Sequence, residues 1–317
     1  MKTSARLENF PIMMFAITMG LSGLSIAYQK AAHLFHCSSL IPSILVALTT
    51  ITFIAISLTY ATKFIMYRQE VKKEFTHPVR VNFFAAFSIT LLLMSIMYQE
   101  LNTTASVALW WVGMVLQAFL TFYTISFWIN HSLEIQHSNP AWFIPIVGNV
   151  VVPIGGIGIV NHNFLMYFFS IGILFWIILF TIILNRIIFH NQLAKKFMPT
   201  LFIFIAPPAV GVISYVKLTG HFDLFASFLF NIGLFFTFLL VFMYKNFMKL
   251  EFFISWWAFT FPLTAMTIAT ILSYHTTKSP FCYYLAIGLL IVSTIVVSFV
   301  AYKTICHMLK KEICVIE

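Results

Sequence analysis

Ten long apolar segments follow one another along the chain, separated by short stretches that carry most of the charged residues and turn formers. A helix needs about 20 mostly apolar residues to cross a hydrocarbon core about 30 Å thick, and the segments approach or exceed this length. The ten predicted spans cover approximately residues 12–28, 41–66, 81–98, 105–129, 142–159, 164–184, 200–216, 224–244, 253–273 and 282–305. Because the connections are short, we expect one transmembrane domain over residues 1–317, built from five helical hairpins.

The odd-numbered segments share a layout in which a proline precedes a run of aromatic residues, followed by small residues and a break. Four of them begin at Phe10-Pro11, His77-Pro78, Asn139-Pro140 and Met198-Pro199. The last odd-numbered segment, the ninth of the ten, carries the run from Trp256 to Pro262 instead. The layout recurs about every 55–65 residues, once per hairpin, and such a repeat predicts equivalent structural units. We therefore expect the five odd helices to surround a common axis.

Composition supports a membrane protein. The chain is 61% hydrophobic and 9% charged, and it contains 37 phenylalanines, whereas a soluble domain carries about 25% charged residues. No apolar segment is followed by a long polar domain, which excludes a soluble enzyme with one membrane anchor. The predicted fold class is an all-α polytopic membrane protein.

Basic residues predict the orientation. All lysines and arginines except Lys30, Lys217 and Lys278 fall on one side, which holds both termini and the even-to-odd connections. Short loops rich in Lys and Arg stay in the cytoplasm. We expect a multi-pass protein of the plasma (inner) membrane with both termini cytoplasmic. This topology also accounts for the net charge of +9, so nucleic acid is not an expected partner.

The predicted spans contain no charged residue near their centres, and all ten histidines fall in loops or at span ends. Ionisable groups within a membrane mark proton relays and ion sites, so their absence here argues against proton-coupled transport. The spacing His131-x-x-Glu134-x-x-His137 resembles a metal site, but we interpret it as a solvated loop. No catalytic motif is present, and we expect no enzyme activity, no metal and no cofactor.

Prolines also interrupt the odd segments further along: Pro153 lies in the fifth, Pro207 and Pro208 in the seventh, and Pro262 in the ninth. A proline inside a helix removes a hydrogen bond and bends the axis. In lipid, such a break survives only where protein or a water-filled cavity satisfies the freed carbonyl. The even segments have no comparable proline except Pro42 at a start. We therefore place the odd helices inside and the even helices outside.

Candidate pore residues follow from this arrangement. The odd helices carry weakly polar side chains that would line an uncharged path: Ser88, Asn149, Thr260 and Thr264. Small residues also promote close helix packing, and that interpretation stays open for the same positions. Five helix N-termini with Arg80 beside them would form a cytoplasmic vestibule for anions, although Arg80 also simply fits the positive-inside rule.

Several long motifs resemble the tellurite-resistance/dicarboxylate transporter family, which includes the plant slow-type anion channels. The matching stretches occur in the family's order and cover nearly the whole chain. They are Phe10-Pro11-Ile12 through Gly20-Leu21-Ser22, the run from Glu74 to Phe84 (EFTHPVRVNFF), Val147-Gly148-Asn149, and the run from Trp256 to Ala265 (WWAFTFPLTA).

The resemblance implies ten helices in five hairpins, a pore lined by the odd helices within each subunit, and a homotrimer. It also implies that a phenylalanine on the ninth helix plugs the pore, and the matching position is Phe261. Phe83 and Phe84 are weaker candidates for a second constriction.

The leading hypothesis is a gated channel that passes small monovalent anions such as chloride or nitrate across the lipid bilayer. The alternative is a carrier or efflux protein for tellurite, sulfite or C4-dicarboxylates, as other branches of the family suggest. Cys37 and Cys282 both fall near the predicted outer surface, and the spacing leaves open whether they pair.

Overall fold

The chain folds into helices alone in the parts that the computed structural model describes, residues 3–35 and 38–314, apart from an isolated bridge between Ile157 and Val160. Within these residues, nine helical segments are long and apolar enough to cross a membrane, and Pro140–Gly156 is a shorter apolar helix. These segments match the predicted spans closely. The prediction of an all-α polytopic membrane protein is confirmed.

Each of the five inner helices begins as a 3-10 helix and continues as an α-helix. The pairs are η1 (Ile12–Met14) with α2 (Phe15–Phe35), η2 (Arg80–Phe84) with α5 (Ala85–Tyr98), η4 (Pro140–Phe143) with α7 (Ile144–Gly156), η5 (Lys195–Ile205) with α9 (Ala206–Thr219), and η6 (Ile254–Phe259) with α12 (Thr260–Thr277). We call the end where these helices begin the proximal end and the opposite end the distal end.

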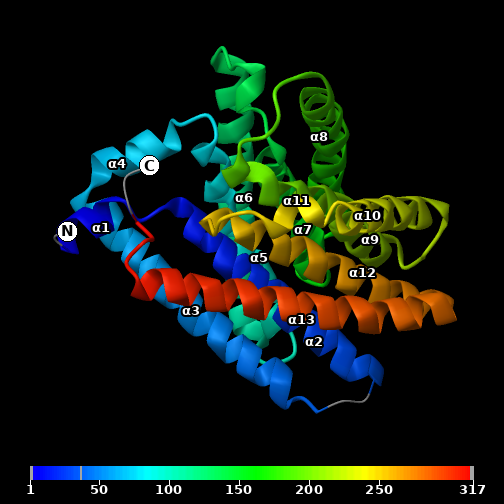
Figure 1. The fold of residues 1–317 in the computed structure, drawn as a ribbon. Helices are drawn as coiled ribbons and strands as arrows, with labels where there is room; N and C mark the ends of the chain where they lie inside the picture. The colour runs from blue at the N-terminus through cyan, green and yellow to red at the C-terminus, as the bar shows by residue number, and fades with distance from the viewer. Residues whose placement is uncertain (1–2, 36–37, 315–317) are drawn as a thin grey trace.

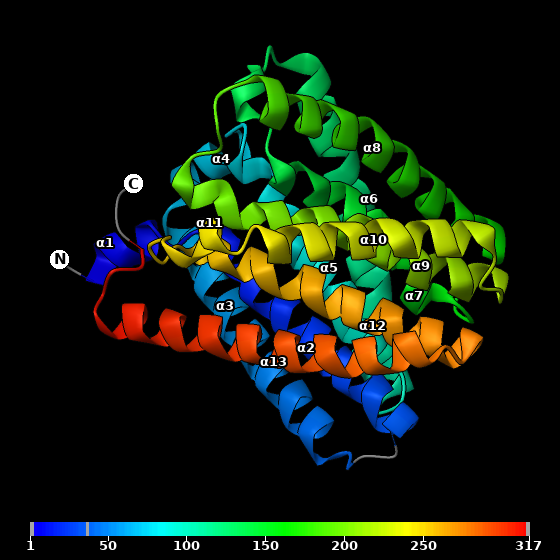
Figure 2. The ribbon, with the colours of Figure 1, turned by 45° about the vertical axis from the view of Figure 1, so that its right-hand side comes forward.

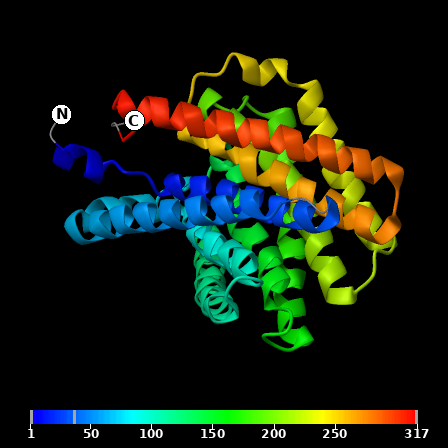
Figure 3. The same cartoon turned by 90° about the horizontal axis from the view of Figure 1, so that it is seen from below.

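The five outer helices are continuous α-helices: α3 (Leu40–Met66), α6 (Thr103–Asn130), α8 (His162–Phe189), α10 (Leu224–Phe242) and α13 (Pro280–Leu309). Four short elements lie in the connections: α1 (Thr3–Glu8), α4 (Arg68–Phe75), η3 (Ile135–His137) and α11 (Lys245–Met248). Helix α1 and the last turn of α13 both lie at the proximal end (Figure 1, Figure 3).

The inner helices form a closed ring in the order α2, α5, α7, α9 and α12, with α12 packed back against α2. Their 3-10 segments contact one another in the same circular order. Each outer helix packs against the inner helix of its own hairpin, as Figure 2 shows for α13 beside α12. In the four long inner segments 72–83% of the most apolar stretch is buried, against 22–44% in the outer helices. The odd helices are therefore inside and the even helices outside.

The structure refines the predicted proline breaks. Pro207 and Pro208 lie in the first turn of α9, and Pro262 is the third residue of α12, so all three mark the junction between a 3-10 segment and an α-helix. A proline is tolerated at such a junction because the hydrogen-bond pattern changes there from i−3 to i−4, and two successive N–H groups would otherwise share one carbonyl. Pro153 is the proline that lies inside α7 itself. The interruptions of the seventh and ninth segments are thus changes of helix type.

The ring closes where glycines of α2 meet threonines of α12. A Cβ atom added at Gly20 would overlap the Thr260 hydroxyl, and one added at Gly23 would overlap the Thr264 hydroxyl. Glycine therefore lets the two backbones approach closely, as small residues do between membrane helices. Both threonine hydroxyls donate to carbonyls of their own chain, those of Trp257 and Phe261. This contact joins the first hairpin to the last.

A buried ion pair holds the proximal end together. Lys63 Nζ, near the end of α3, lies 3.0 Å from Glu74 Oε2 in α4, and both side chains are almost fully buried. The same ammonium group donates to the carbonyl oxygen of Phe10, directly before η1, and the Tyr60 hydroxyl donates to Glu74. The cluster fixes the start of the first inner helix to α3 and α4. This pair was not predicted from the sequence.

A methyl group at the ring closure is expected to destabilise the fold. Gly20→Ala must displace Thr260, and overpacking of this kind costs about 1–3 kcal/mol. Gly288 on α13 is exposed, and a Cβ there meets no atom within 4 Å. Gly288→Ala is the matched control and should be neutral or slightly stabilising, because alanine is the better helix former. Thermal unfolding in detergent compares the two, and equal melting temperatures would contradict the close contact.

Removing one partner of the buried ion pair should lower the free energy of unfolding far more than removing one partner of a surface ion pair. Lys63→Met leaves the Glu74 carboxylate buried and unpaired, a loss of about 3–5 kcal/mol. The double variant Lys63→Met/Glu74→Gln should recover much of it, because no charge remains. Lys73 and Glu70 form an exposed pair within α4, so Lys73→Met should change stability by less than about 1 kcal/mol. Denaturation in detergent tests this ordering, and a Lys63→Met variant as stable as Lys73→Met would refute it.

Candidate functional site

A narrow cavity of about 40 Å³ lies between the inner helices, near their 3-10 segments. All five inner helices contribute to its wall. The lining residues are Met13, Ala16, Met19, Phe83, Ala86, Ile89, Ile144, Val147, Ile203, Ala206, Ile254, Ser255, Trp257, Ala258, Phe261 and Pro262. The cavity thus lies on the axis that the sequence repeat predicts.

The wall residues recur at every third position of each inner helix. The series are Met13, Ala16 and Met19; Phe83, Ala86 and Ile89; Ile144 and Val147; Ile203 and Ala206; and Ser255, Ala258 and Phe261. In a 3-10 helix, residues three apart lie directly above one another, whereas an α-helix turns them progressively away. The 3-10 starts therefore direct the first wall residues of four inner helices at the axis, whereas Ile144 and Val147 both lie in α7, after the 3-10 segment.

Two of the three predicted phenylalanines reach the cavity. Phe261 lies in the wall beside Pro262 and is only 6% exposed; its ring packs against Gly23, where an added Cβ would be 3.4 Å from Cδ2. Phe83 lies in the wall as well. Phe84 does not line the cavity, because its ring packs edge-on against Phe75 and Tyr60.

The predicted polar residues lie at helix contacts outside the cavity wall. Ser88 Oγ donates to Gln117 Oε1 of α6 at 2.7 Å, and Asn149 Nδ2 donates to Thr121 Oγ1 of α6 at 2.8 Å. Thr260 and Thr264 occupy the ring closure described above. The structure gives each of these side chains a packing role, and their pore-lining role stays a prediction.

The remaining predicted residues lie around the cavity. Arg80 begins η2 at the proximal end, half-buried, with its backbone N–H donating to His77 Nδ1 at 3.3 Å. Pro262 is part of the wall, whereas Pro153, Pro207 and Pro208 are not among the lining residues. Cys282 is buried, with Sγ 3.4 Å from Ser273 Oγ, and Cys37 lies outside the described residues.

The cavity wall is more apolar than the sequence suggested. Ser255 is the one hydroxyl-bearing residue among the wall residues given above, and its Oγ donates to the carbonyl oxygen of Lys196. Along the inner helices, the fully buried hydroxyls of Ser22, Ser25 and Ser214 find no hydrogen-bond partner among the described residues. A buried hydroxyl without a partner costs about 1–3 kcal/mol, so these groups favour water or a ligand nearby.

A second cavity, of about 610 Å³, opens at the distal end. It is lined by Lys30 and His33 of α2, Lys217 of α9, His275 of α12, Lys278 at the end of α12, and Glu100 between α5 and α6, among others. The three lysines are the ones that the sequence placed apart from all other basic residues. Their shared side of the membrane was the available signal, but nothing in the sequence indicated that they surround one cavity.

Comparison with known proteins assigns the family. Residues 9–305 match the family model described as SLAC1, voltage-dependent anion channel. The chain is 31% identical to the S-type anion channel SLAH2 of Arabidopsis thaliana, over 85% of this chain and 54% of the relative. It is 28% identical to the guard cell S-type anion channel SLAC1 of the same plant, over 95% and 56%. It is also 28% identical to the tellurite resistance protein TehA homolog of Haemophilus influenzae, over 84% and 81%.

The chain spans about half the length of these plant relatives, and most of the bacterial one. The family match covers all five hairpins, from directly before η1 to near the end of α13. The chain is therefore a member of the voltage-dependent anion channel family to which the SLAC1 model belongs.

Proposed function

We propose that the chain is a gated anion channel, passing small monovalent anions such as chloride and nitrate down their gradient along the axis of the inner ring. The observation that carries this proposal is the position of Phe261 in the wall of the narrow central cavity, in a chain of this family. The relatives named as S-type anion channels support the class of substrate.

The described conformation fits a closed state. One water molecule needs about 10–15 Å³ of accessible cavity volume, and this cavity offers about 40 Å³, which is room for only a few waters. An anion with its hydration shell does not fit, and an anion without it would lie against apolar side chains. Apolar constrictions of this kind block ions by dewetting as well as by size.

Phe261 is the side chain best placed to control the opening. It belongs to the apolar wall, and its carbonyl oxygen already accepts a bond from Thr264 in the following turn. The next residue, Pro262, has no N–H to anchor it in the helix. A change of the Phe261 rotamer would widen the cavity while the ring closure between α2 and α12 stays in place. Phe83 faces the same cavity and would form a second, weaker constriction.

Selectivity follows from the wall. Without charged groups lining the narrowest part, discrimination depends on radius and on the free energy of dehydration. We therefore propose that nitrate passes more readily than chloride, and chloride more readily than fluoride, because weakly hydrated anions lose less on entering an apolar passage. The 3-10 segments also direct the positive ends of five helices toward the proximal mouth, where Arg80 lies.

Coupling to protons has little support in the central cavity, since its wall contains no titratable side chain among the described residues. The carrier hypothesis for tellurite, sulfite or C4-dicarboxylates remains the alternative, which the similarity to the tellurite resistance homolog keeps open. Reversal potentials that follow the anion gradient alone indicate a channel, whereas a shift with the proton gradient indicates a carrier.

Replacing Phe261 with alanine should increase anion flux in liposomes by at least about tenfold, because removing the ring enlarges the constriction and lowers its dehydration barrier. Phe83→Ala should produce a smaller increase. Bilayer currents or a nitrate-efflux assay measure both variants, with nitrate, chloride and fluoride compared on each.

Phe259→Ala is the matched control. Phe259 lies two residues earlier on the same helix and is also buried, but it packs against Phe202 and Phe247 away from the cavity wall. Its loss should affect stability and leave conductance near the wild-type level. Unchanged conductance of a folded Phe261→Ala protein, or an equal increase in Phe259→Ala, would remove Phe261 from the gate.

Three further properties are part of the proposal: a homotrimer, which the resemblance implies, and a plasma (inner) membrane location with cytoplasmic termini, which the basic residues predict. Mass measurement in detergent should give three times the 36.4 kDa of one chain. Labelling of a cysteine placed in α1, from either side of intact cells, tests the orientation. A monomeric mass would exclude the trimer without affecting the pore argument, since the ring lies within one chain.

A further inference from the structure

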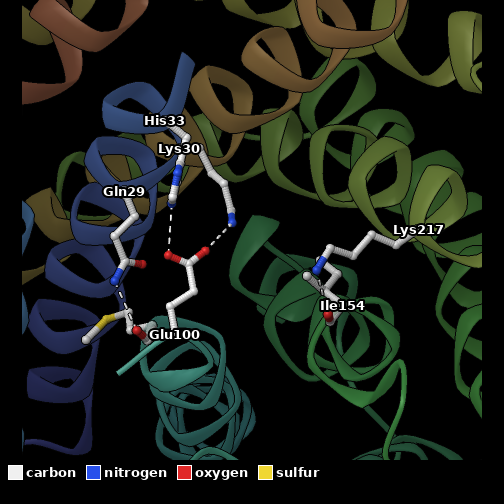
Figure 4. Close-up of polar contacts among 7 residues, drawn as sticks. Gln29, Lys30, His33, Glu100, Ile154 and Lys217 are labelled. Atoms are coloured by element: carbon white, nitrogen blue, oxygen red, sulfur yellow. Dashed lines mark hydrogen bonds and ion pairs between the residues drawn. The ribbon is translucent and has the colours of Figure 1, made fainter. Parts of the chain in front are cut away.

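The distal cavity brings together charged groups from segments that are far apart in the sequence. Lys30 and His33 end α2, Glu100 lies after α5, Lys217 is in the last turn of α9, and Lys278 ends α12. Figure 4 shows the Glu100 side chain extending from the α5–α6 connection toward Lys30 and His33 of α2, with Lys217 on the other side of the view. The remaining inner helix, α7, takes part through the carbonyl oxygen of Ile154, which accepts a hydrogen bond from Lys217 Nζ at 3.2 Å. All five hairpins thus meet at this mouth.

Glu100 accounts for only part of the positive charge. Its Oε2 lies 2.9 Å from His33 Nε2, and its Oε1 lies 3.6 Å from Lys30 Nζ. The hydrogen bond with His33 lowers the pKa of the Glu100 carboxyl below its usual value, so the carboxylate stays charged at neutral pH. Against this one carboxylate the cavity holds three lysines. Two positive charges remain in excess even with both histidines neutral.

The backbone at Lys278 points to a requirement for its side chain. Lys278 adopts a left-handed conformation (φ 56°) at the end of α12, whereas α9 uses Gly220 (φ 76°) for the same purpose. Glycine takes this conformation at no steric cost, while other residues are disfavoured by roughly 1–2 kcal/mol. A lysine at this position is therefore poor for local stability. Its ammonium group lies over the Tyr274 ring, beside the cavity.

Lys217 has donors to spare. The Ile154 carbonyl near the end of α7 takes one of its three N–H groups, and a lysine near a helix C-terminus is common. Capping alone, however, needs neither an open cavity beside the ammonium group nor two more lysines around it. The Lys217 side chain is exposed, and the space that it lines is large enough for a hydrated anion.

We propose that the distal cavity is an anion-binding mouth in which Lys217 and Lys278 hold a small inorganic anion, while Glu100 occupies Lys30 and His33 as an internal counter-ion. Clefts lined by one sign of charge raise the local concentration of the opposite ion. The inference deepens the proposed function and rests on it for its role in transport: the mouth would collect or release anions at the end of the path opposite Arg80. The binding itself does not require conduction.

The test measures the electrostatic potential in the cavity directly. His275 is exposed and lines the cavity without being one of the lysines, so His275→Cys serves as a reporter in a protein whose four native cysteines are replaced by alanine. Negatively and positively charged methanethiosulfonates are applied to this protein in detergent, and mass spectrometry gives both modification rates. Relative to a free thiol, the anionic reagent should be favoured by at least about tenfold.

Variants of the reporter protein that each remove one charge test the contributions of Lys217, Lys278 and Glu100 to the potential in the cavity. Lys217→Met and Lys278→Asn should each reduce the preference for the anionic reagent several-fold, and Glu100→Gln should increase it. Asparagine suits the left-handed conformation at position 278, so that variant remains available if Lys217→Met does not fold. Lys195→Met, which removes a lysine at the proximal end, is the control and should leave the ratio unchanged.

Anion binding is tested by protection. Nitrate should slow modification of His275→Cys by the anionic reagent more than the bulky anion gluconate does at the same ionic strength. Equal protection by both anions, or a ratio that Lys217→Met and Lys278→Asn leave unchanged, would overturn the proposal and reduce these lysines to helix caps. Because the readout needs no ion flux, a protein that fails to conduct would contradict the proposed function and not this site.

A flux measurement connects anion binding at the distal mouth to transport. In the Phe261→Ala background, Lys217→Met should raise the distal nitrate concentration needed for half-maximal flux several-fold and leave the proximal dependence unchanged. If Lys217→Met leaves the distal nitrate concentration for half-maximal flux unchanged, the mouth plays no part in transport.

Discussion

The contact between α2 and α12 is the interaction on which the rest of the fold depends. Four of the five contacts between inner helices join hairpins that follow one another along the chain. The fifth closes the ring, and there Gly20 and Gly23 of α2 leave room for Thr260 and Thr264 of α12. In a bilayer, apolar side chains gain little from leaving lipid, so close packing has to hold helices together. The same contact places Phe261 against Gly23, which links closure of the ring to the dimensions of its central cavity.

The sequence predicted the helices well because their lengths and apolar character are set by the bilayer. It also predicted which helices lie inside, because prolines interrupt the odd segments. Of the four prolines expected at their starts, Pro11, Pro78 and Pro140 lie at or just before a start, whereas Pro199 lies inside η5. It did not predict the 3-10 segments. Proline and aromatic residues are compatible with either helix type at a start, and the choice depends on contacts with the neighbouring segments of the ring.

For the candidate site, some residues were predicted correctly from the sequence and others were not. The family motif led to Phe261, which the structure places in the cavity wall, but the polar side chains Ser88 and Asn149 point to α6. Their helix faces could not be assigned from composition alone. The buried Lys63–Glu74 pair and the distal lysines were missed for a related reason. A charge at the end of a span looks solvated in the sequence, and only the three-dimensional arrangement reveals its partners.

The 3-10 starts make the length of the chain in these segments as important as its composition. In a helix of three residues per turn, inserting or deleting one residue rotates all that precedes it by about 120°. In η6, which holds the wall residues Ile254, Ser255, Trp257 and Ala258, such a change would turn several of them away from the axis and bring a helix-packing face into the cavity. A similar insertion in an outer helix would turn part of its packed face away from the inner helix, but the wall residues would stay directed at the axis. Evolution of this architecture should therefore accept insertions in the connections and exclude them from the 3-10 segments around the axis of the inner ring.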